Sequence, residues 1–248
     1  MKDITLIHGF PDGPFIFSDL SQKLASFANC HLYALPGYGG DSNFCIAKNS
    51  PIKPWIQMLN KVADDISEFS TRNHLIGHDW GGVLCFYMAA LYPDLVESIT
   101  IINAPHPTKF KNLLASNLTQ KKMSSYIDFF KTQNAADILK KDHFRELKKI
   151  IAGNVDRKPH LMQSYTKSVD NMLDYYRLFN FMEMEDLPFI RARTNIIWGI
   201  NDKFLCEENL SSLHSFCNVD RIVKVNCGHW VFIEDPENVL KHIMDFLG

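Results

Sequence analysis

Short apolar runs alternate with segments of helical periodicity over most of this 248-residue chain. The runs that we expect to be strands are 4–7, 31–35, 74–77, 99–103, 195–199 and 221–225. Helical spacing is found at 17–27, 55–69, 83–91 and 239–246. Strands that are separated by helices imply right-handed βαβ units. The sequence therefore predicts an α/β fold with a mostly parallel sheet of about six strands, flanked by helices on both faces.

The strand signal disappears between Pro105 and about Pro188. This stretch is long, rich in lysine and helical in its pattern. Because it lies between two expected strands, we predict that it is a helical lid over the strand ends. The expected division is a core of residues 1–105 and 188–248 and a lid of residues 106–187.

Composition excludes several classes of protein. Hydrophobic residues make up 46% and charged residues 22% of the chain, and the net charge is -2, so neither nucleic acid nor an anionic membrane is an expected partner. No apolar run approaches the ~20 residues of a membrane span, and the first run is too short for a signal peptide. We expect a cytoplasmic protein with no metal and no cofactor. Six cysteines without a CxxC pair are expected to be buried or loose thiols: 30, 45, 85, 206, 217 and 227.

The segment Gly77–Gly82 joins an expected strand to an expected helix. Small residues at Gly77 and Gly81 permit the tight turn of a nucleophile elbow, Gly-x-Nuc-x-Gly, and Asp79 occupies the nucleophile position. The positive end of the helix dipole would favour an anion there. Taken alone, Asp79 could equally be a helix cap.

Two further strand ends carry chemically competent residues. Asp202 follows one strand, and His229 follows the next. Ligands of open parallel sheets bind beyond the carboxyl ends of the strands, where these residues would meet Asp79. Singly, Asp202 could be a turn residue and His229 a core histidine. Together they follow the nucleophile–acid–base order of α/β-hydrolases, which favours a catalytic triad.

The segment His8–Pro11 follows the first expected strand. In this architecture that position contributes half of the oxyanion hole, so we expect the backbone N–H groups of Phe10 and Trp80 to be its donors. The sequence leaves open whether the peptide bond before Pro11 is cis.

Several motifs together resemble the epoxide hydrolase and haloalkane dehalogenase branch of the α/β-hydrolase superfamily. They are His8–Gly13, Leu35–Gly39, Gly77–Gly82, Asn103–Pro107, Trp198–Asp202 and Gly228–Pro236. They span nearly the whole chain. The resemblance implies an α/β-hydrolase fold with an inserted lid.

An aspartate nucleophile narrows the chemistry. Attack on an ester would give an anhydride, whereas attack on an sp³ carbon that carries a leaving oxygen or halide gives a stable alkyl ester of Asp79. His229, oriented by Asp202, would then activate water to hydrolyse that ester. The expected substrate is a small, apolar, electrophilic molecule.

The resemblance also implies two lid tyrosines that protonate the epoxide oxygen. The segments Tyr126–Phe130 and Asp174–Arg177 resemble the lid segments that carry them. We therefore assign Tyr126 and Tyr176 as the ring-opening acids, against the alternative that both are core aromatics. We expect an aromatic pocket, although each residue singly could be ordinary core. The expected substrate-binding residues are Phe15, His106, Phe110, Phe130, Phe179 and Trp230.

Other functions stay open on the sequence alone. A haloalkane or haloacetate dehalogenase is the second interpretation. However, the residue at position 10 is Phe, the lid contains no tryptophan, and the nucleophile is followed by Trp80 rather than arginine. A non-catalytic ligand-binding protein would be expected to have lost a catalytic position, and none is lost. A serine esterase would need another nucleophile.

The resemblance breaks at the N-terminus. Members of this family carry an antiparallel strand pair before the first strand, and here only three residues precede Ile4. The strand at 31–35 should then lie at an exposed edge, which is a liability unless it is paired. We expect either a homodimer through that edge or a misplaced gene start.

Overall fold

The computed structural model describes residues 2–38, 50–151 and 159–248. Its six strands form one sheet in the order β2-β1-β3-β4-β5-β6, and all neighbouring strands are parallel. The strands are β1 (Lys2–Ile7), β2 (Ala28–Tyr33), β3 (Asn73–His78), β4 (Val96–Ile102), β5 (Ile190–Gly199) and β6 (Cys217–Val225). The predicted α/β fold with about six strands is confirmed.

All six strands begin before the apolar runs indicate, and the difference is largest for β5 and β6. β5 starts at Ile190 and β6 at Cys217, several residues before the predicted starts. In β5 the early part contains Arg191 and Arg193, which interrupt the apolar pattern. β2 ends at Tyr33 rather than Leu35, because the chain turns there and the Tyr38 amide donates to the Leu35 carbonyl.

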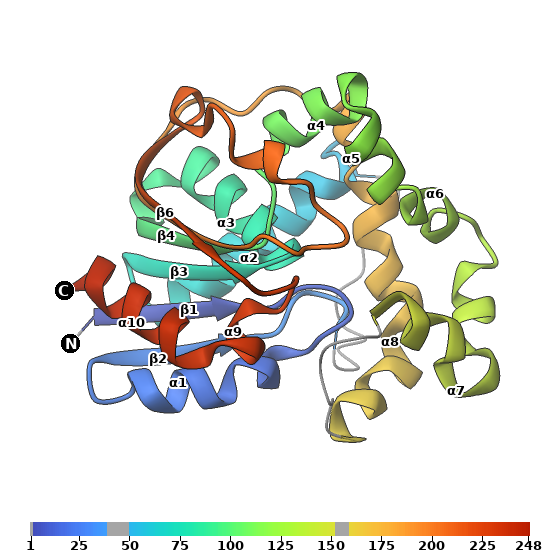
Figure 1. Cartoon of the computed structure of the whole chain (residues 1–248), viewed down its shortest axis with the longest axis horizontal. Helices are drawn as coiled ribbons and strands as arrows, with labels where there is room; N and C mark the ends of the chain where they lie inside the picture. The colour runs from blue at the N-terminus through green and yellow to red at the C-terminus, as the bar shows by residue number, and fades with distance from the viewer. Residues whose placement is uncertain (1, 39–49, 152–158) are drawn as a thin grey trace.

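Helices cover both faces of the sheet (Figure 1). On one face lie α1 (Ser18–Leu24), preceded by the 3-10 turn Pro14–Phe17, then α9 (Val231–Glu234) and α10 (Pro236–Leu247). On the other lie α2 (Pro54–Phe69) and α3 (Trp80–Leu91). The alternation of side chains along a strand separates two cores: Ile102 packs with the cluster of α1 and α10, and its neighbour Ile101 with that of α2 and α3. α3 is buried almost throughout, as its lack of polar residues predicts.

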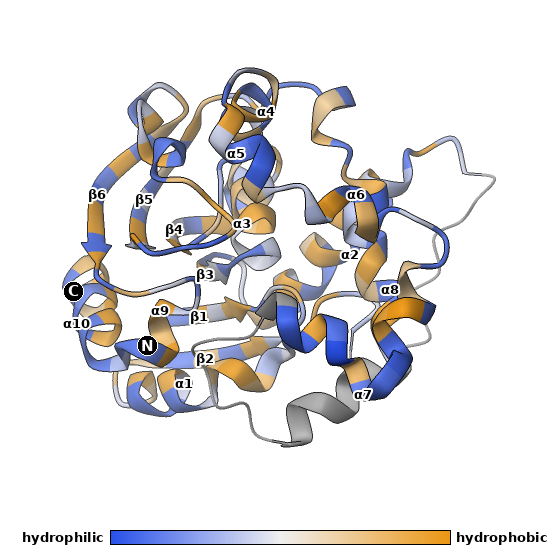
Figure 2. Ribbon diagram, turned by 45° about the vertical axis from the view of Figure 1, so that its right-hand side comes forward, coloured by the Kyte–Doolittle hydropathy of each residue, from blue (hydrophilic) through white to orange (hydrophobic). Residues whose placement is uncertain are grey.

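The segment between β4 and β5 contains no strand among its described residues. Its helices are α4 (Pro107–Ser116), α5 (Leu118–Met123), α6 (Tyr126–Phe130), α7 (Ala135–Ile151) and α8 (Pro159–Leu178), followed by the 3-10 turn Phe181–Glu183. In Figure 1, α6, α7 and α8 lie beyond the carboxyl end of β1. α7 is two helices joined at a kink, because residues 141–144 have non-helical backbone angles. Figure 2 shows hydrophilic and hydrophobic residues alternating along α7, in keeping with the lysine-rich pattern.

Shorter 3-10 turns complete the described part of the chain, at Pro93–Leu95, Glu207–Leu210 and Leu213–Ser215. No helix in the described ranges is long and apolar enough to cross a membrane. β2 forms an edge of the sheet, as predicted, and a homodimer through this edge stays a prediction. Five cysteines are free thiols, four of them buried, which agrees with the prediction; Cys45 and the turn residues Gly39 and Gly40 lie outside the described residues.

Candidate active site

Asp79 occupies a strained turn between β3 and α3. Its backbone angles are φ 51° and ψ -120°, which few residues other than glycine adopt. The turn depends on close backbone approach, since a Cβ atom at Gly77 would overlap Gly81 and one at Gly81 would overlap Ile7. This is the geometry that the elbow motif predicts. It pushes the Asp79 side chain out beyond the strand end.

The side chain of Asp79 does not cap the helix. It stands at the N-cap position of α3 but makes no capping hydrogen bond. Its Oδ1 instead accepts a hydrogen bond of 2.7 Å from the backbone N–H of Phe10. The helix-cap interpretation is therefore wrong. The Phe10 N–H is already directed at the carboxyl group, as an oxyanion donor must be; the peptide bond between Phe10 and Pro11 is cis.

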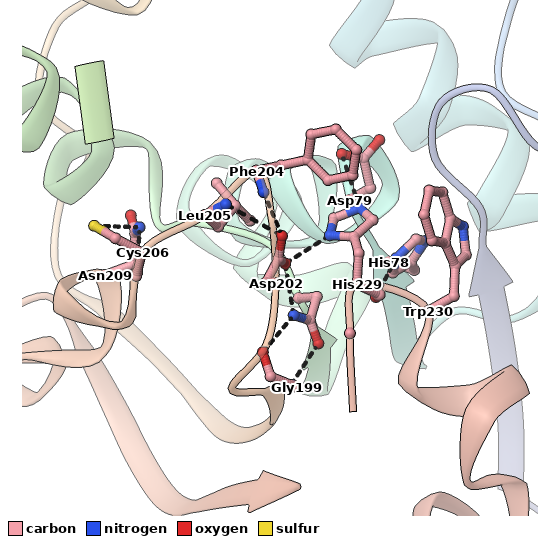
Figure 3. Close-up of polar contacts among 12 residues, drawn as sticks. His78, Asp79, Gly199, Asp202, Phe204, Leu205, Cys206, Asn209, His229 and Trp230 are labelled. Carbon is pink, nitrogen blue, oxygen red and sulfur yellow. Dashed lines mark hydrogen bonds and ion pairs between the residues drawn. The ribbon is translucent and has the colours of Figure 1, made fainter. Parts of the chain in front are cut away.

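The ends of β3, β5 and β6 bring Asp79, Asp202 and His229 together (Figure 3). His229 Nδ1 lies 2.6 Å from Asp202 Oδ2, and its Nε2 lies 3.7 Å from Asp79 Oδ2. In this arrangement Nδ1–H donates to Asp202 and Nε2 faces the Asp79 carboxylate. The three residues thus have the relative positions of a nucleophile, a base and an orienting acid.

Asp202 is held by more than His229. Asn103 donates from Nδ2 to Asp202 Oδ2 at 2.7 Å, and the backbone N–H groups of Phe204 and Leu205 donate to Oδ1 at 2.7 and 3.2 Å. Asn103 was missed as a site residue by the sequence reasoning, although it opens one of the family-like motifs. The sequence signal is an Asn directly after an apolar strand, since Asn tolerates the positive φ of 42° found there better than most residues.

The charge on His229 depends on its two carboxylate neighbours. Burial of the imidazole opposes its positive form, but Asp202 first and then Asp79 outweigh burial and raise the pKa of His229 to about 10. The two carboxylates therefore favour the imidazolium form of His229 in the resting site. Any reaction that neutralises Asp79 removes part of what holds that proton.

His78, next to Asp79, was also missed. Its Nε2 lies 3.0 Å from the backbone carbonyl oxygen of His229, and its ring is 4.6 Å from the His229 ring. Figure 3 shows it beside His229. Its contacts fix the backbone that carries His229.

The inserted helices bring Tyr126 and Tyr176 to the same place. Their rings lie 6.1 Å apart, and both line a pocket with Asp79 and His229. Burial, and the nearby charge of Asp79, raise the pKa of both phenols. The adjacent Tyr175 is directed elsewhere, since its hydroxyl donates to the Pro36 carbonyl at 3.0 Å. Of these two neighbouring tyrosines of α8, Tyr176 lines the pocket and Tyr175 does not.

The pocket is aromatic and small. Its other lining residues are Phe10, Phe130, Phe204 and Trp230, and its volume of about 20 Å³ has room for a water molecule. Phe130 and Trp230 are where the sequence predicts them. Phe204 was missed; its ring lies 5.1 Å from that of His229 and 5.6 Å from that of Tyr126. Its position two residues after the acid is the only sequence signal.

Four predicted pocket residues do not line this pocket. Phe15 is 66% exposed, because Phe17 takes the buried position of the same 3-10 turn. Phe110 is buried against Phe181, and His106 is buried between Phe86 and Phe216. Phe179 instead lines a neighbouring cavity of about 40 Å³, to which Trp80 and Tyr176 also contribute. The predicted role as lining of this pocket is corrected for Phe15, His106 and Phe110, since the latter two side chains are packed in the core and Phe15 lies at the surface.

The Trp80 side chain packs flat against Phe181, with 5.7 Å between ring centroids, and meets the Tyr176 ring edge-on at 5.2 Å. Its backbone N–H as the second oxyanion donor stays a prediction. Among the described residues, no group of three or more His, Cys, Asp or Glu side chains is arranged to hold a metal ion.

The sequence model of the alpha/beta hydrolase fold family matches residues 4–236. The chain belongs to this family. Among its relatives, Epoxide hydrolase 3 of Xenopus tropicalis is 25% identical over 260 residues, which cover 98% of this hydrolase and 70% of that protein. Epoxide hydrolase 2 of Caenorhabditis elegans is 24% identical over 270 residues, 99% of this hydrolase and 73% of that protein.

Solved structures agree on the fold. An epoxide hydrolase from Bacillus megaterium, solved as a mutant, superposes with a TM-score of 0.83 and 23% identity. The match covers 100% of this hydrolase and 93% of that chain. In sequence and fold this hydrolase is an enzyme of the epoxide hydrolase-like kind.

Proposed function

We propose that this hydrolase opens epoxides to diols through an alkyl ester on Asp79. The observation that carries the proposal is the meeting of four groups at one pocket: a carboxylate on a strained elbow, the His229–Asp202 pair, and two tyrosine hydroxyls. A carboxylate nucleophile with phenolic acids opposite suits an sp³ carbon whose leaving oxygen needs a proton. The names of the two epoxide hydrolase relatives support the same substrate class.

In the first step an oxygen of Asp79 attacks a ring carbon, and the carbon–oxygen bond of the epoxide breaks. The electron pair stays on the epoxide oxygen, which takes a proton from Tyr126 or Tyr176. The charge of Asp79 raises the pKa of both phenols, and that charge is lost when the ester forms. The tyrosines therefore become stronger acids as the alkoxide develops.

The same loss of charge prepares the second step. Asp79 contributes to the raised pKa of His229, so esterification lowers that pKa, and His229 passes its proton to the tyrosinate and becomes the neutral base. His229 Nε2 then takes a proton from water, and the hydroxide adds to the ester carbonyl carbon of Asp79. The Phe10 N–H, 2.7 Å from Asp79 Oδ1, would stabilise the oxyanion, together with the Trp80 N–H.

Collapse of that intermediate breaks the bond to the alkyl oxygen, which leaves with the proton from His229 as the diol. The proton that remains on the Asp79 carboxyl group passes to His229, which restores the resting imidazolium and carboxylate. An oxygen atom of water thus enters the Asp79 carboxylate before it can appear in a diol. No net proton is gained or lost over the cycle.

We further propose that residues 106–187 act as a lid over the core of residues 1–105 and 188–248. Tyr126, Phe130 and Tyr176 reach the pocket from this segment, whereas Asp79 and His229 come from the core. The aromatic lining favours an apolar aryl or alkyl epoxide. A halide substrate has less support, because a halide leaving group needs no proton from the two tyrosines that line the pocket.

A single turnover in oxygen-18 water tests the mechanism. With enzyme in excess over styrene oxide, the ester route gives a diol without label in the first turnover and puts oxygen-18 into Asp79. Mass spectrometry of the diol and of the peptide that holds Asp79 reads both positions. Label in the first diol would mean that water attacks the epoxide directly, and would overturn the proposal.

A further inference from the structure

Gln120, on α5, is a fully buried amide whose hydrogen-bonding capacity is completely used. Its Oε1 accepts from the Cys206 N–H at 2.9 Å and from Asn209 Nδ2 at 2.8 Å. Its Nε2 donates to Ser124 Oγ at 2.8 Å and to the Phe204 carbonyl at 2.9 Å. A side-chain amide has two N–H donors and an oxygen that accepts twice, so its orientation is fixed by its partners.

On one side these bonds reach the loop that follows the catalytic acid. The Phe204 carbonyl accepts from Gln120, while the Phe204 N–H donates to Asp202 Oδ1 at 2.7 Å. The Phe204 ring contacts His229, as Figure 3 shows. Gln120 therefore helps to fix the backbone between the acid and the pocket.

On the other side the bonds reach the helix that carries Tyr126. Ser124, which accepts from the Gln120 amide, is buried and is the first residue of the turn into α6. Its carbonyl accepts the Ile127 N–H at 3.0 Å, so it fixes the first turn of that helix. The Phe204 ring then lies between the two parts, 5.6 Å from Tyr126 and 5.1 Å from His229.

We propose that Gln120 is a positioning residue for epoxide ring opening. It clamps the inserted helices to the loop of the catalytic acid and thereby sets the position of Tyr126 relative to Asp79 and His229. The inference rests on the proposed function, because it takes Tyr126 as a proton donor. Gln120 itself touches neither the pocket nor the reacting groups.

The first test replaces Gln120 with methionine, which has a similar length and none of the four hydrogen bonds. We expect the single-turnover rate of styrene oxide opening to fall by roughly 10- to 100-fold, because a displaced catalytic group costs about that much. The effect should appear in kcat more than in KM. Gln133→Met, the same change at an exposed glutamine of the inserted segment, is the matched control and should keep the wild-type rate.

The second test uses Gln120→Glu. Its carboxylate can still accept from Cys206 and Asn209, but it can donate to Phe204 or Ser124 only when protonated. The activity of the folded variant relative to the wild type should therefore rise as the pH falls. A ratio that is flat with pH, or that falls, would overturn the clamp.

A crystal structure of the Gln120→Met variant, which needs no substrate, tests whether Gln120 positions Phe204 and Tyr126. We expect the Phe204 ring and Tyr126 to move relative to His229; unchanged positions of both would overturn the proposal. If the wild type turns over no epoxide, the proposed function fails, and this structure still decides whether Gln120 positions the two residues.

Discussion

Asn103 donates a 2.7 Å hydrogen bond to Oδ2 of Asp202, the same oxygen that receives Nδ1–H of His229. The Oδ1 of Asn103 in turn accepts the Gly199 N–H at 2.8 Å, so its amide is anchored to the end of β5. The acid is thus oriented by a side chain from the neighbouring strand end. The orientation of His229 depends on this amide as well as on Asp202.

Asn103→Gly removes that amide and tolerates the positive φ of the position. A hydrogen bond to a charged group contributes about 1.5–3 kcal/mol, so we expect kcat for an epoxide to fall by roughly 10- to 100-fold. Steady-state kinetics with circular dichroism as a check on folding would measure this. A folded variant with the wild-type kcat would show that Asp202 needs no such support.

Asp79→Gly should separate stability from activity. The backbone strain at φ 51° is relieved by glycine, so we expect the free energy of unfolding to rise by about 1 kcal/mol. Activity should be abolished because the nucleophile is lost. Urea unfolding and an epoxide assay measure the two effects, and residual turnover above the uncatalysed rate would exclude Asp79 as the nucleophile.

Changing both Tyr126 and Tyr176 to phenylalanine should stop epoxide opening, because the alkoxide then has no acid. Reaction with an alkyl bromide, whose leaving group needs no proton, should be largely retained. Tyr175→Phe is the matched control: it removes the bond to the Pro36 carbonyl and should cost about 1 kcal/mol of stability without blocking the chemistry. Equal losses for both classes of substrate in the double variant would argue against the acid role.

Two buried histidines should make the fold sensitive to acid. His8 is held neutral, with Nδ1 near the Gly9 carbonyl and Nε2 accepting from the Leu35 N–H, and burial lowers its pKa to about 4. Burial likewise lowers the pKa of His106 to about 4, with Asp186 opposing. The unfolded chain binds these protons near pH 6.5, so stability is present above that pH and is lost as the pH falls toward 4.

Each histidine should account for about 3 kcal/mol of that loss, at about 1.4 kcal/mol per pH unit. Urea unfolding of His106→Phe between pH 7 and pH 4 should therefore show a shallower decline than the wild type. His214→Gln, at an exposed position, should leave the decline unchanged. An identical pH dependence for His106→Phe would contradict the neutral, buried state of that ring.

The sequence predicts those parts of the site whose residues lie in short motifs or directly after a strand. Asp79 lies in a short motif whose glycines are needed by the turn itself, and Asp202 and His229 each follow an apolar strand. Their meeting needs only the rule that parallel strands end at one edge. The roles of Tyr126 and Tyr176 are predicted only from the resemblance of whole segments to the family, because nothing in their spacing along the chain indicates that α6 and α8 meet.

The parts that the sequence does not predict depend on contacts between distant segments. The role of Gln120 arises from a loop 84 residues away along the chain, and that of Asn103 from an acid 99 residues away. The sequence predicts Phe15 in the pocket because it is aromatic and follows a motif. In the structure, however, one 3-10 turn buries Phe17 and exposes Phe15. Such choices are decided by packing.

The central claim, an ester on Asp79 that His229 hydrolyses, is tested most directly by intact-protein mass spectrometry of the His229→Gln variant after incubation with styrene oxide. The hydrolytic step should fail first, so we predict a mass increase of one substrate molecule that maps to the peptide holding Asp79. 1,2-Dibromoethane in a parallel incubation identifies a preference for halides. A folded variant that acquires no adduct from the epoxide, or an adduct on another residue, would contradict the account.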